Sequence, residues 1–260
     1  MILPYITNKE KEIIKTVLQF RFQDRSHLQQ ILNHKDKKTI QFWLNNLVRN
    51  KYLIRDEEKL GKKDYPVYYM GASGIRFLKT LGTVDFNLLR NLYREKKHSP
   101  AFVSHCLFLA DICLTFKKLS SEPIAFSCYT FSDYSSPLSP FSFLTDLKPA
   151  IIVEREEKEN TSYLLFEIIP ATFPFYRMKK RIRDYLQFLQ NGDWEIQTRT
   201  PLPEVFFVLP TRDLKYRLKH YAKTLLERTW NDDLSINLST EDNIKREGVN
   251  AEIWEKIEYV

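Results

Sequence analysis

Lysine, amide and arginine side chains recur along one predicted helix in the first third of the chain. We expect this helix to begin after Asp36 and to carry polar residues on its outward face. These residues are Lys37, Lys38, Gln41, Asn45 and Arg49. Lysine and arginine bind phosphate oxygens, and asparagine or glutamine can form two hydrogen bonds with the edge of adenine. The pattern indicates a helix that reads duplex DNA; the alternative is an ordinary solvated face, since an exposed lysine needs no ligand.

Apolar residues at helical spacing predict the elements around this face. Thr7 and Glu10 fit a capping box that opens a first helix, and Ser26 is expected to cap a short second one. The third helix has a core-facing stripe at i, i+3, i+4, i+7 and i+8. The stripe consists of Ile40, Trp43, Leu44, Leu47 and Val48. A strand at 52–55, a loop with Lys59, Lys62 and Lys63, a strand at 67–70 and a helix at 73–81 are expected to follow.

Three short helices followed by a hairpin form the order of a winged helix-turn-helix, whose third helix enters the major groove. The lysines of the hairpin loop are then expected to contact neighbouring phosphates. Winged helices also bind proteins, so an adaptor that never touches DNA is an alternative.

Positive charge is concentrated in the same region. The chain has 40 basic and 33 acidic residues, a net charge of +7. Residues 1–97 contain 20 basic and 10 acidic residues, a net charge of +10. The remaining residues contain 20 basic and 23 acidic residues, a net charge of −3. Such a field attracts nucleic acid or anionic membrane. No uninterrupted apolar run approaches the roughly 20 residues of a membrane span, so we expect DNA and no membrane as the partner.

Cysteine usage indicates a reducing compartment. Cys106, Cys113 and Cys128 form no CxxC pair, and the first residues contain no secretory signal pattern. We therefore expect reduced, buried thiols in a cytoplasmic protein. Zinc binding is not expected either, because the histidines and cysteines have no tight ligand spacing.

The rest of the chain predicts a second, larger domain. The charged, helix-prone residues 85–98 are interpreted as a connecting helix between a domain at 1–84 and a domain at 99–260. Helices are expected at 100–116, 177–189 and 211–230, and strands at 124–131, 147–154, 163–169, 205–209 and 234–238. This order predicts an α+β fold in which a mixed-sheet α/β domain follows the winged helix. Residues 132–145, rich in serine and proline, are interpreted as a loop.

Four segments in a fixed order carry a resemblance to a known family. They are YYMGASG at 68–74, His98 with HCLFLADI at 105–112, LKPA at 147–150 with YLLFEI at 163–168, and a basic helix ending in YLQF at 185–188. Together they resemble the replication-relaxation family of bacterial plasmid and mobile-element proteins over nearly the whole length. The resemblance implies a DNA-binding accessory protein that acts in replication, mobilisation or DNA relaxation.

The order of elements in the second domain is also similar to the restriction-endonuclease-like core, PD-(D/E)xK. That core holds a divalent metal with acids on adjacent strands and places a lysine two residues after the second acid. Where the family has Pro-Asp-Ala, this chain has Pro149 followed directly by Ala150, without the aspartate. Glu167 corresponds to the acid on the second strand, and Ile169 lies at the position of the lysine. The resemblance therefore implies a pseudo-nuclease scaffold, with no metal or other cofactor.

Two further acids are weak candidates for a catalytic Mg²⁺ site with Glu167. Asp146 lies four residues before Ala150, and Glu154 lies at the far end of the strand. The simpler interpretation is that Asp146 caps a strand and Glu154 begins a turn. Glu167 lies in an apolar strand, so we expect it to have a hydrogen-bonding or charged partner.

A second basic surface is predicted at the start of the helix at 177–189. It consists of Arg177, Lys179, Lys180, Arg181 and Arg183. These residues are expected to contact further phosphates or an acidic partner; the alternative is a solvated helix face. No nucleophile elbow or phosphate-binding loop is present, and 6 glycines in all make nucleotide hydrolysis an unfavoured function.

These observations favour a DNA-binding accessory protein. The protein is expected to form a homodimer, and its candidate protein partners are other replication, relaxase or transcription proteins. The alternatives are a transcription regulator with the same DNA-binding head and a metal-dependent DNA endonuclease. A footprint at a promoter would favour the regulator, and metal-dependent nicking of plasmid DNA would favour the endonuclease.

Overall fold

The structure is a computed structural model that describes residues 3–60, 66–158, 160–229 and 234–257. The chain forms two compact units. The first unit contains Met1–Leu114 and Tyr129–Thr145, and the second contains Thr115–Cys128 and Asp146–Val260. Each unit is described by itself below.

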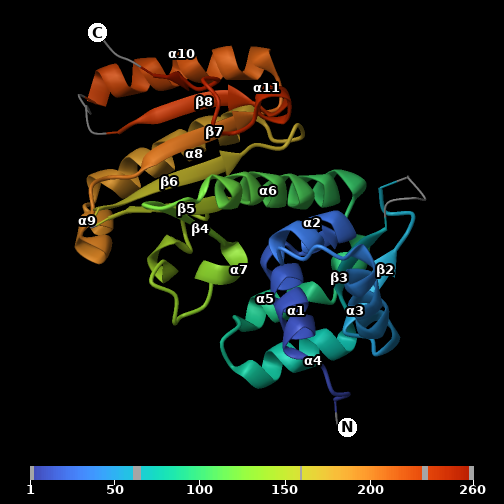
Figure 1. Ribbon diagram of the computed structural model, residues 1–260. Helices are drawn as coiled ribbons and strands as arrows, with labels where there is room; N and C mark the ends of the chain where they lie inside the picture. Colours follow the sequence, from blue (N-terminus) through green and yellow to red (C-terminus); the bar gives the residue numbers. More distant parts are fainter. Residues whose placement is uncertain (1–2, 61–65, 159, 230–233, 258–260) are drawn as a thin grey trace. The chain divides into compact units, whose positions relative to one another are not determined.

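The first unit begins with a series of short helices and strands (Figure 1). They are α1 (Asn8–Phe20), β1 (Phe22–Asp24), α2 (Arg25–Ile31), α3 (Lys37–Arg49), β2 (Leu53–Asp56), β3 (Val67–Met70), α4 (Ala72–Leu81) and α5 (Phe86–Leu92). The predicted capping box of α1 is confirmed: Glu10 Oε2 accepts a hydrogen bond from the Thr7 amide at 2.8 Å. The described strands form an antiparallel sheet in the order β1-β3-β2.

Strand β1 is a finding that the sequence did not predict. Phe22 lies opposite Tyr69 of β3, with 5.4 Å between the ring centroids. The start of α2 also differs from the prediction, because Asp24 and not Ser26 caps it. The Asp24 carboxylate accepts a hydrogen bond from the His27 amide at 2.8 Å, which satisfies one of the unpaired amides of the first turn.

The core of the first unit is built from the inward faces of α1 and α3. Ile40, Leu44 and Leu47 of the predicted stripe are fully buried, while Trp43 and Val48 are partly buried. Burial of each large apolar side chain contributes about 1.5–3 kcal/mol to stability. The packing of this stripe fixes the rotation of α3 and leaves its opposite face toward solvent.

Two glycines allow α4 to approach the start of β2. The Gly71 amide donates a hydrogen bond to the Tyr52 carbonyl at 2.8 Å. A Cβ on Gly71 would overlap the carbonyl oxygen of Lys51, and one on Gly74 would overlap that of Tyr52. The backbone approach therefore requires glycine at both positions of the YYMGASG segment.

Helix α6 (Pro100–Leu119) contributes its first fifteen residues to this unit. By length and composition alone it could cross a membrane, although 44% of its apolar window is buried inside the structure. No uninterrupted apolar run is visible in the sequence because Ser104, His105 and Asp111 interrupt the helix. Val103 and Cys106 pack in an apolar cluster of the first unit, as in the core helix of a globular protein.

Residues 132–145, which the sequence predicted as a loop, consist mostly of turns and also contain two short helical segments. They contain most of α7 (Phe131–Tyr134) and a 3₁₀ turn, η2 (Ser142–Leu144); a further turn, η1 (Glu95–Lys97), follows α5. Helix α7 begins at a capping box in which Asp133 accepts a hydrogen bond from the Thr130 amide at 2.7 Å. Tyr134 is fully buried, so this short helix is anchored by its side chain as well as by its cap.

The second unit contains a mixed sheet with helices on its faces, which confirms the expected α+β class (Figure 1). Its described strands lie in the order β4 (Ile124–Thr130), β5 (Ile151–Glu157), β6 (Asn160–Ile168), β7 (Glu204–Leu209), β8 (Ile236–Thr240) and β9 (Glu255–Lys256). Strands β6, β7 and β8 are parallel, and β5 and β9 pair antiparallel at either side. The helices are α8 (Phe175–Gln190), α9 (Asp193–Thr198), α10 (Arg212–Thr229) and α11 (Glu241–Glu247).

Side chains of β6 alternate between the two faces of this sheet. Phe166 stacks on Phe206 and lies against Phe116 of α6 and Trp254, with centroid distances of 5.0, 5.7 and 5.9 Å. Its neighbour Glu167 points to the opposite face, where it meets α8. The hairpin between β5 and β6 is tighter than predicted, because the two strands continue to the pair Glu157 and Asn160. The sequence also missed α9, α11 and β9.

Candidate nucleic-acid interface on α3

Helix α3 begins at a well-formed cap. Asp36 accepts hydrogen bonds from the amides of Lys38 at 2.9 Å and Thr39 at 3.1 Å. The Thr39 hydroxyl also donates to Asp36 Oδ2 at 2.5 Å. The hydroxyl of Thr39 and the amide of Lys38 hold the pKa of the Asp36 carboxyl below its usual value. The cap therefore carries a negative charge that partly offsets the two lysines of the first turn.

The outward face of α3 is open to solvent. Lys38, Phe42, Asn45 and Arg49 are exposed and follow one another at i, i+4, i+7 and i+11, so they form one stripe. Lys37 is exposed beside this stripe. Neither Lys38 nor Arg49 takes part in any ion pair found among the described residues of the first unit. The stripe therefore presents uncompensated positive charge.

Gln41 and Asn45 form the end of a hydrogen-bonded chain that begins on α2. Arg25 Nη1 lies 3.5 Å from Gln41 Oε1, and Gln41 Nε2 donates to Asn45 Oδ1 at 2.9 Å. An amide oxygen has two lone pairs, so Asn45 can still accept a hydrogen bond from a base. In this arrangement Gln41 orients the side chain of Asn45.

Two residues of this surface were missed by the sequence analysis. Phe42 is 69% exposed, and Arg25 approaches the amides of α3 from the neighbouring helix. The signal for Phe42 was present in the sequence, since a phenylalanine two positions after Ile40 lies outside the apolar stripe. No pattern in the sequence indicated that Arg25 lies beside Gln41.

The predicted clamp in the hairpin loop is only partly described. Lys59 Nζ donates a hydrogen bond to the Lys96 carbonyl at 2.5 Å, so its ammonium group is bound within the first unit. Lys62 and Lys63 lie outside the described residues. Arg55 on β2 pairs with Glu57 at 3.1 Å. The charge of Arg55 is therefore paired with an acid, whereas Lys59 keeps its positive charge, because a backbone carbonyl is a neutral acceptor and uses one of the three donors of the ammonium.

Glu167, the strand acid of the second unit, is the partner of a buried arginine. Arg181 Nε donates to Glu167 Oε2 at 3.2 Å, Arg181 Nη2 contacts Oε1, and the Tyr185 hydroxyl donates to Oε1 at 2.9 Å. Burial raises the pKa of the Glu167 carboxyl, although the Arg181 charge acts in the opposite direction. Both carboxylate oxygens are thus occupied by side chains of α8, which is the partner that the sequence led us to expect.

The other two candidate acids do not join Glu167. Asp146 is exposed, and Glu154 accepts a hydrogen bond from the Tyr163 hydroxyl at 2.7 Å. Within the described residues, histidine, cysteine and acidic side chains form no group of three that could hold a metal ion. The three carboxylates therefore have separate surroundings.

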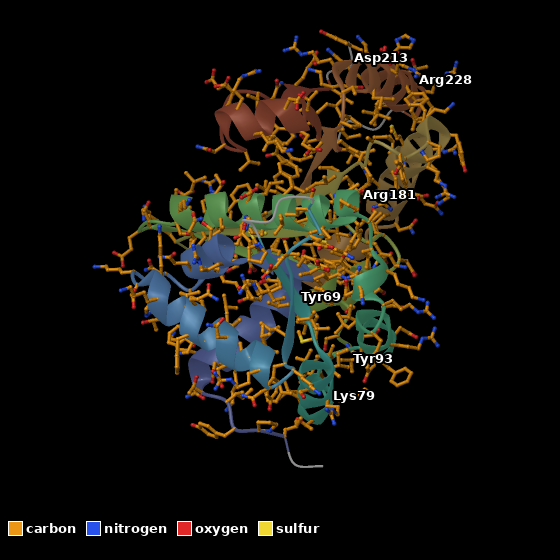
Figure 2. The ribbon with its side chains drawn as sticks, turned by 90° about the vertical axis from the view of Figure 1, so that its right-hand side faces the viewer. Tyr69, Lys79, Tyr93, Arg181, Asp213 and Arg228 are labelled. Carbon is orange, nitrogen blue, oxygen red and sulfur yellow. The ribbon has the colours of Figure 1, made fainter. Side chains whose placement is uncertain are left out.

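The predicted basic surface on α8 is divided by its partners. Arg177, Lys180 and Arg183 are exposed, and Lys180 pairs with Asp184 at 2.8 Å. Arg181, which is labelled in Figure 2, instead pairs with Glu167, and its side chain is 17% exposed. Arg181 is thus part of the interior of the second unit, whereas Arg177 and Arg183 remain at its surface.

Comparison with known proteins gives weak likenesses. No protein-family model matches the chain, and no curated protein matches it. Among solved structures, restriction endonuclease FokI is similar with a TM-score of 0.30 and 10% identity, covering 95% of this chain and 47% of that chain. Restriction endonuclease FokI bound to DNA is similar with a TM-score of 0.31 and 9% identity, covering 95% and 46%. The chain therefore spans about half the length of these proteins.

Proposed function

We propose that this chain binds duplex DNA through a winged helix-turn-helix formed by α1 to β3, with α3 in the major groove. The observation that carries the proposal is the solvent-exposed stripe of Lys38, Phe42, Asn45 and Arg49. It combines phosphate-binding cations with a base-reading amide on one helix face. Helix α2 and the turn before Asp36 support α3 from the opposite side, as in other helix-turn-helix proteins.

The charge arrangement supports a phosphate partner. Positive side chains at a helix N-terminus oppose the helix dipole, at a cost of about 0.3–1 kcal/mol each. Lys37 and Lys38 occupy this position, and DNA phosphates beside them would offset the cost. Lys59 stays a proposed phosphate contact, because its hydrogen bond to the Lys96 carbonyl uses one of the three donors of its ammonium group and leaves its charge in place.

The process in which this binding acts is proposed from the family resemblance alone. It would be replication, mobilisation or relaxation of plasmid or mobile-element DNA in the cytoplasm, with the protein as an accessory factor and a dimer on two half-sites. Mapping of bound sites in the native host separates this from transcription control. Sites at replication or transfer origins support the proposed process, and sites confined to promoters contradict it.

Salt dependence of binding tests the assignment of α3. We would measure the affinity of the full chain for a duplex selected from a random library, at several salt concentrations. Lys38→Ala and Arg49→Ala should each weaken binding and reduce the slope of log K against log salt by about one unit. Asn45→Ala should weaken binding to the selected site by about 5- to 100-fold, with much less effect on unrelated duplexes.

Lys9→Ala is the matched control. Lys9 is an exposed lysine of the same unit, but its charge is paired with Glu12 at 2.8 Å. We expect this variant to bind like the unaltered chain. If the combined Lys38, Asn45 and Arg49 variant keeps both its affinity and its salt slope, α3 is not the DNA-binding element.

A further inference from the structure

A shallow groove lies between α8 and α10 on the second unit. It has a volume of about 490 Å³ and is lined by Phe175, Lys179, Tyr216, Arg217, His220 and Tyr221. This volume falls within the range of about 300–1,000 Å³ that is usual for sites of small organic groups. The two helices contact each other, and Asp213 and Arg228, near the two ends of α10, are labelled in Figure 2.

Aromatic rings and cations alternate along the groove. The Arg217 guanidinium carbon lies 4.3 Å from the Phe175 ring centroid. Lys179 Nζ lies 5.3 Å from the Tyr221 centroid and 5.8 Å from the Phe175 centroid. Cations within about 6 Å of a ring are attracted to its face. These contacts hold the two charges at the groove.

Tyr216 presents a largely uncovered ring at the rim. Its side chain is 62% exposed, and Lys215 Nζ lies 5.5 Å from its centroid. Lys215 is itself paired with Glu255 at 2.9 Å. A large aromatic side chain that remains exposed in this way offers a flat surface on which another ring can stack.

The acids near the groove leave a net positive charge within it. Glu255 forms ion pairs with Lys215 and Lys219, and Asp184 forms one with Lys180. Asp213 approaches Arg217 only to 3.8 Å and is 78% exposed. Among the described residues, no acid forms an ion pair with Lys179, so Lys179 and Arg217 keep most of their charge available for an anionic ligand.

We infer that this groove binds single-stranded DNA, with an unpaired base stacked on Tyr216 and the flanking phosphates bound by Lys179 and Arg217. Sites for single strands combine a positive groove with stacking aromatic side chains. In a duplex the faces of the bases are covered by their neighbours, so an exposed tyrosine can stack only on an unpaired base. The site lies on the second unit and does not depend on the duplex-binding role proposed for α3.

Fluorescence anisotropy with three probes tests this inference on the full chain. The probes are a labelled 12-nucleotide oligothymidylate, the same backbone with abasic sites in place of the thymines, and a 12-base-pair duplex. We expect the oligothymidylate to bind more tightly than the abasic strand, because only the former has bases to stack. Tyr216→Ala should weaken oligothymidylate binding by about 5- to 100-fold and should remove most of its advantage over the abasic strand.

Two further variants separate charge from stacking. Arg217→Ala should weaken binding of the oligothymidylate and of the abasic strand alike, because it removes a phosphate contact. Tyr216→Phe should bind like the unaltered chain, since the ring is kept. The matched control is Tyr93→Ala in the first unit: Tyr93 is 55% exposed and has Lys79 Nζ 5.6 Å from its ring (Figure 2), yet it lies outside the groove.

Several outcomes would overturn the inference. The first is equal affinity for the abasic strand and the oligothymidylate, and the second is an unaltered affinity of Tyr216→Ala for the oligothymidylate. The third is displacement of the oligothymidylate by polyglutamate at equal charge, which would indicate an acidic protein partner instead. Loss of oligothymidylate binding in the combined α3 variant, with Tyr216→Ala unaffected, would place the single-strand site on α3. If the α3 variant still binds the oligothymidylate, the groove binds single strands independently of α3. This conclusion holds whether or not α3 binds duplex DNA.

Discussion

His27 of α2 and Asp111 of α6 form an ion pair with 2.9 Å between Nε2 and Oδ1. The other ring nitrogen of His27 lies 3.0 Å from Asp24, the cap of the same helix, although not in line for a hydrogen bond. Burial favours the neutral ring, but the hydrogen bond to Asp111 and the nearby Asp24 outweigh it and raise the pKa of His27 to about 9. The structure of the first unit therefore depends on a histidine that is charged at neutral pH.

This pair predicts that the first unit loses stability in mildly alkaline solution. Because the pKa of His27 is higher in the folded chain than its usual 6.5, the stabilisation is complete below pH 6.5 and is lost as the pH rises through about 9. The shift corresponds to about 3 kcal/mol, and since Asp111 is largely exposed we expect roughly half of that. Urea unfolding between pH 6 and pH 9.5 measures the change.

The control for this prediction is His27→Gln, which keeps a hydrogen-bonding side chain but cannot be charged. This variant should be less stable at pH 6 and should show a flatter dependence on pH. Identical pH profiles for the two proteins would mean that His27 does not carry the charge.

A second prediction concerns the ion pair between Glu167 and Arg181. Removal of one partner leaves a buried charge without compensation, which typically costs about 3–5 kcal/mol. We expect Arg181→Met to destabilise the second unit by this amount, whereas the double variant Glu167→Leu with Arg181→Met should regain most of the loss. The free energy of urea unfolding gives both values.

The exposed Arg183→Met on the same helix is the control and should change stability by about 0.5 kcal/mol or less. If the loss in free energy of unfolding of the double variant equals the sum of the losses of the two single variants, Glu167 and Arg181 do not act as a pair. The same experiment tests the interpretation of Glu167 as a structural residue, because a catalytic remnant needs no arginine across both of its oxygens.

The elements that position α3 could be predicted because their signals are local. A cap at Asp36 and an apolar stripe repeating at 3–4 residues fix where the helix begins and which face it buries. Strand β1 gave no such signal, because it has three residues and its hydrogen bonds come from β3, some forty-five residues later. Short elements whose hydrogen-bond partners are distant in the sequence cannot be predicted from the spacing of apolar residues.

The same distinction applies to the candidate sites. The outward direction of Lys38 and Asn45 follows from the helix period alone. The binding of Lys59 to Lys96 and of Arg181 to Glu167 depends on segments far apart in the sequence, so composition predicted two basic surface residues that are in fact bonded within their units. The groove between α8 and α10 was missed for the same reason: Phe175 and Arg217 lie on different helices, and the sequence does not show that they meet.

A third prediction follows from the exposed ring of Phe42 in the middle of the proposed reading helix. Apolar side chains recognise the C5 methyl group of thymine in the major groove. We expect Phe42→Ala to weaken binding to the selected duplex by about 5- to 100-fold, the usual effect of one lost base contact. Replacement of the thymines by uracil, which lacks the methyl group, should weaken binding of the unaltered chain.

Competition binding with thymine and uracil duplexes of otherwise identical sequence makes this test specific. In Phe42→Ala the two duplexes should bind equally, because the side chain that senses the methyl group is gone. Phe86→Ala is the control, since Phe86 of the same unit is also 69% exposed but lies on α5 and should leave the preference for thymine intact. A preference that survives in Phe42→Ala would show that another residue reads the methyl group, whereas a general loss of affinity for every duplex would mean that Phe42 supports α3 rather than reading a base.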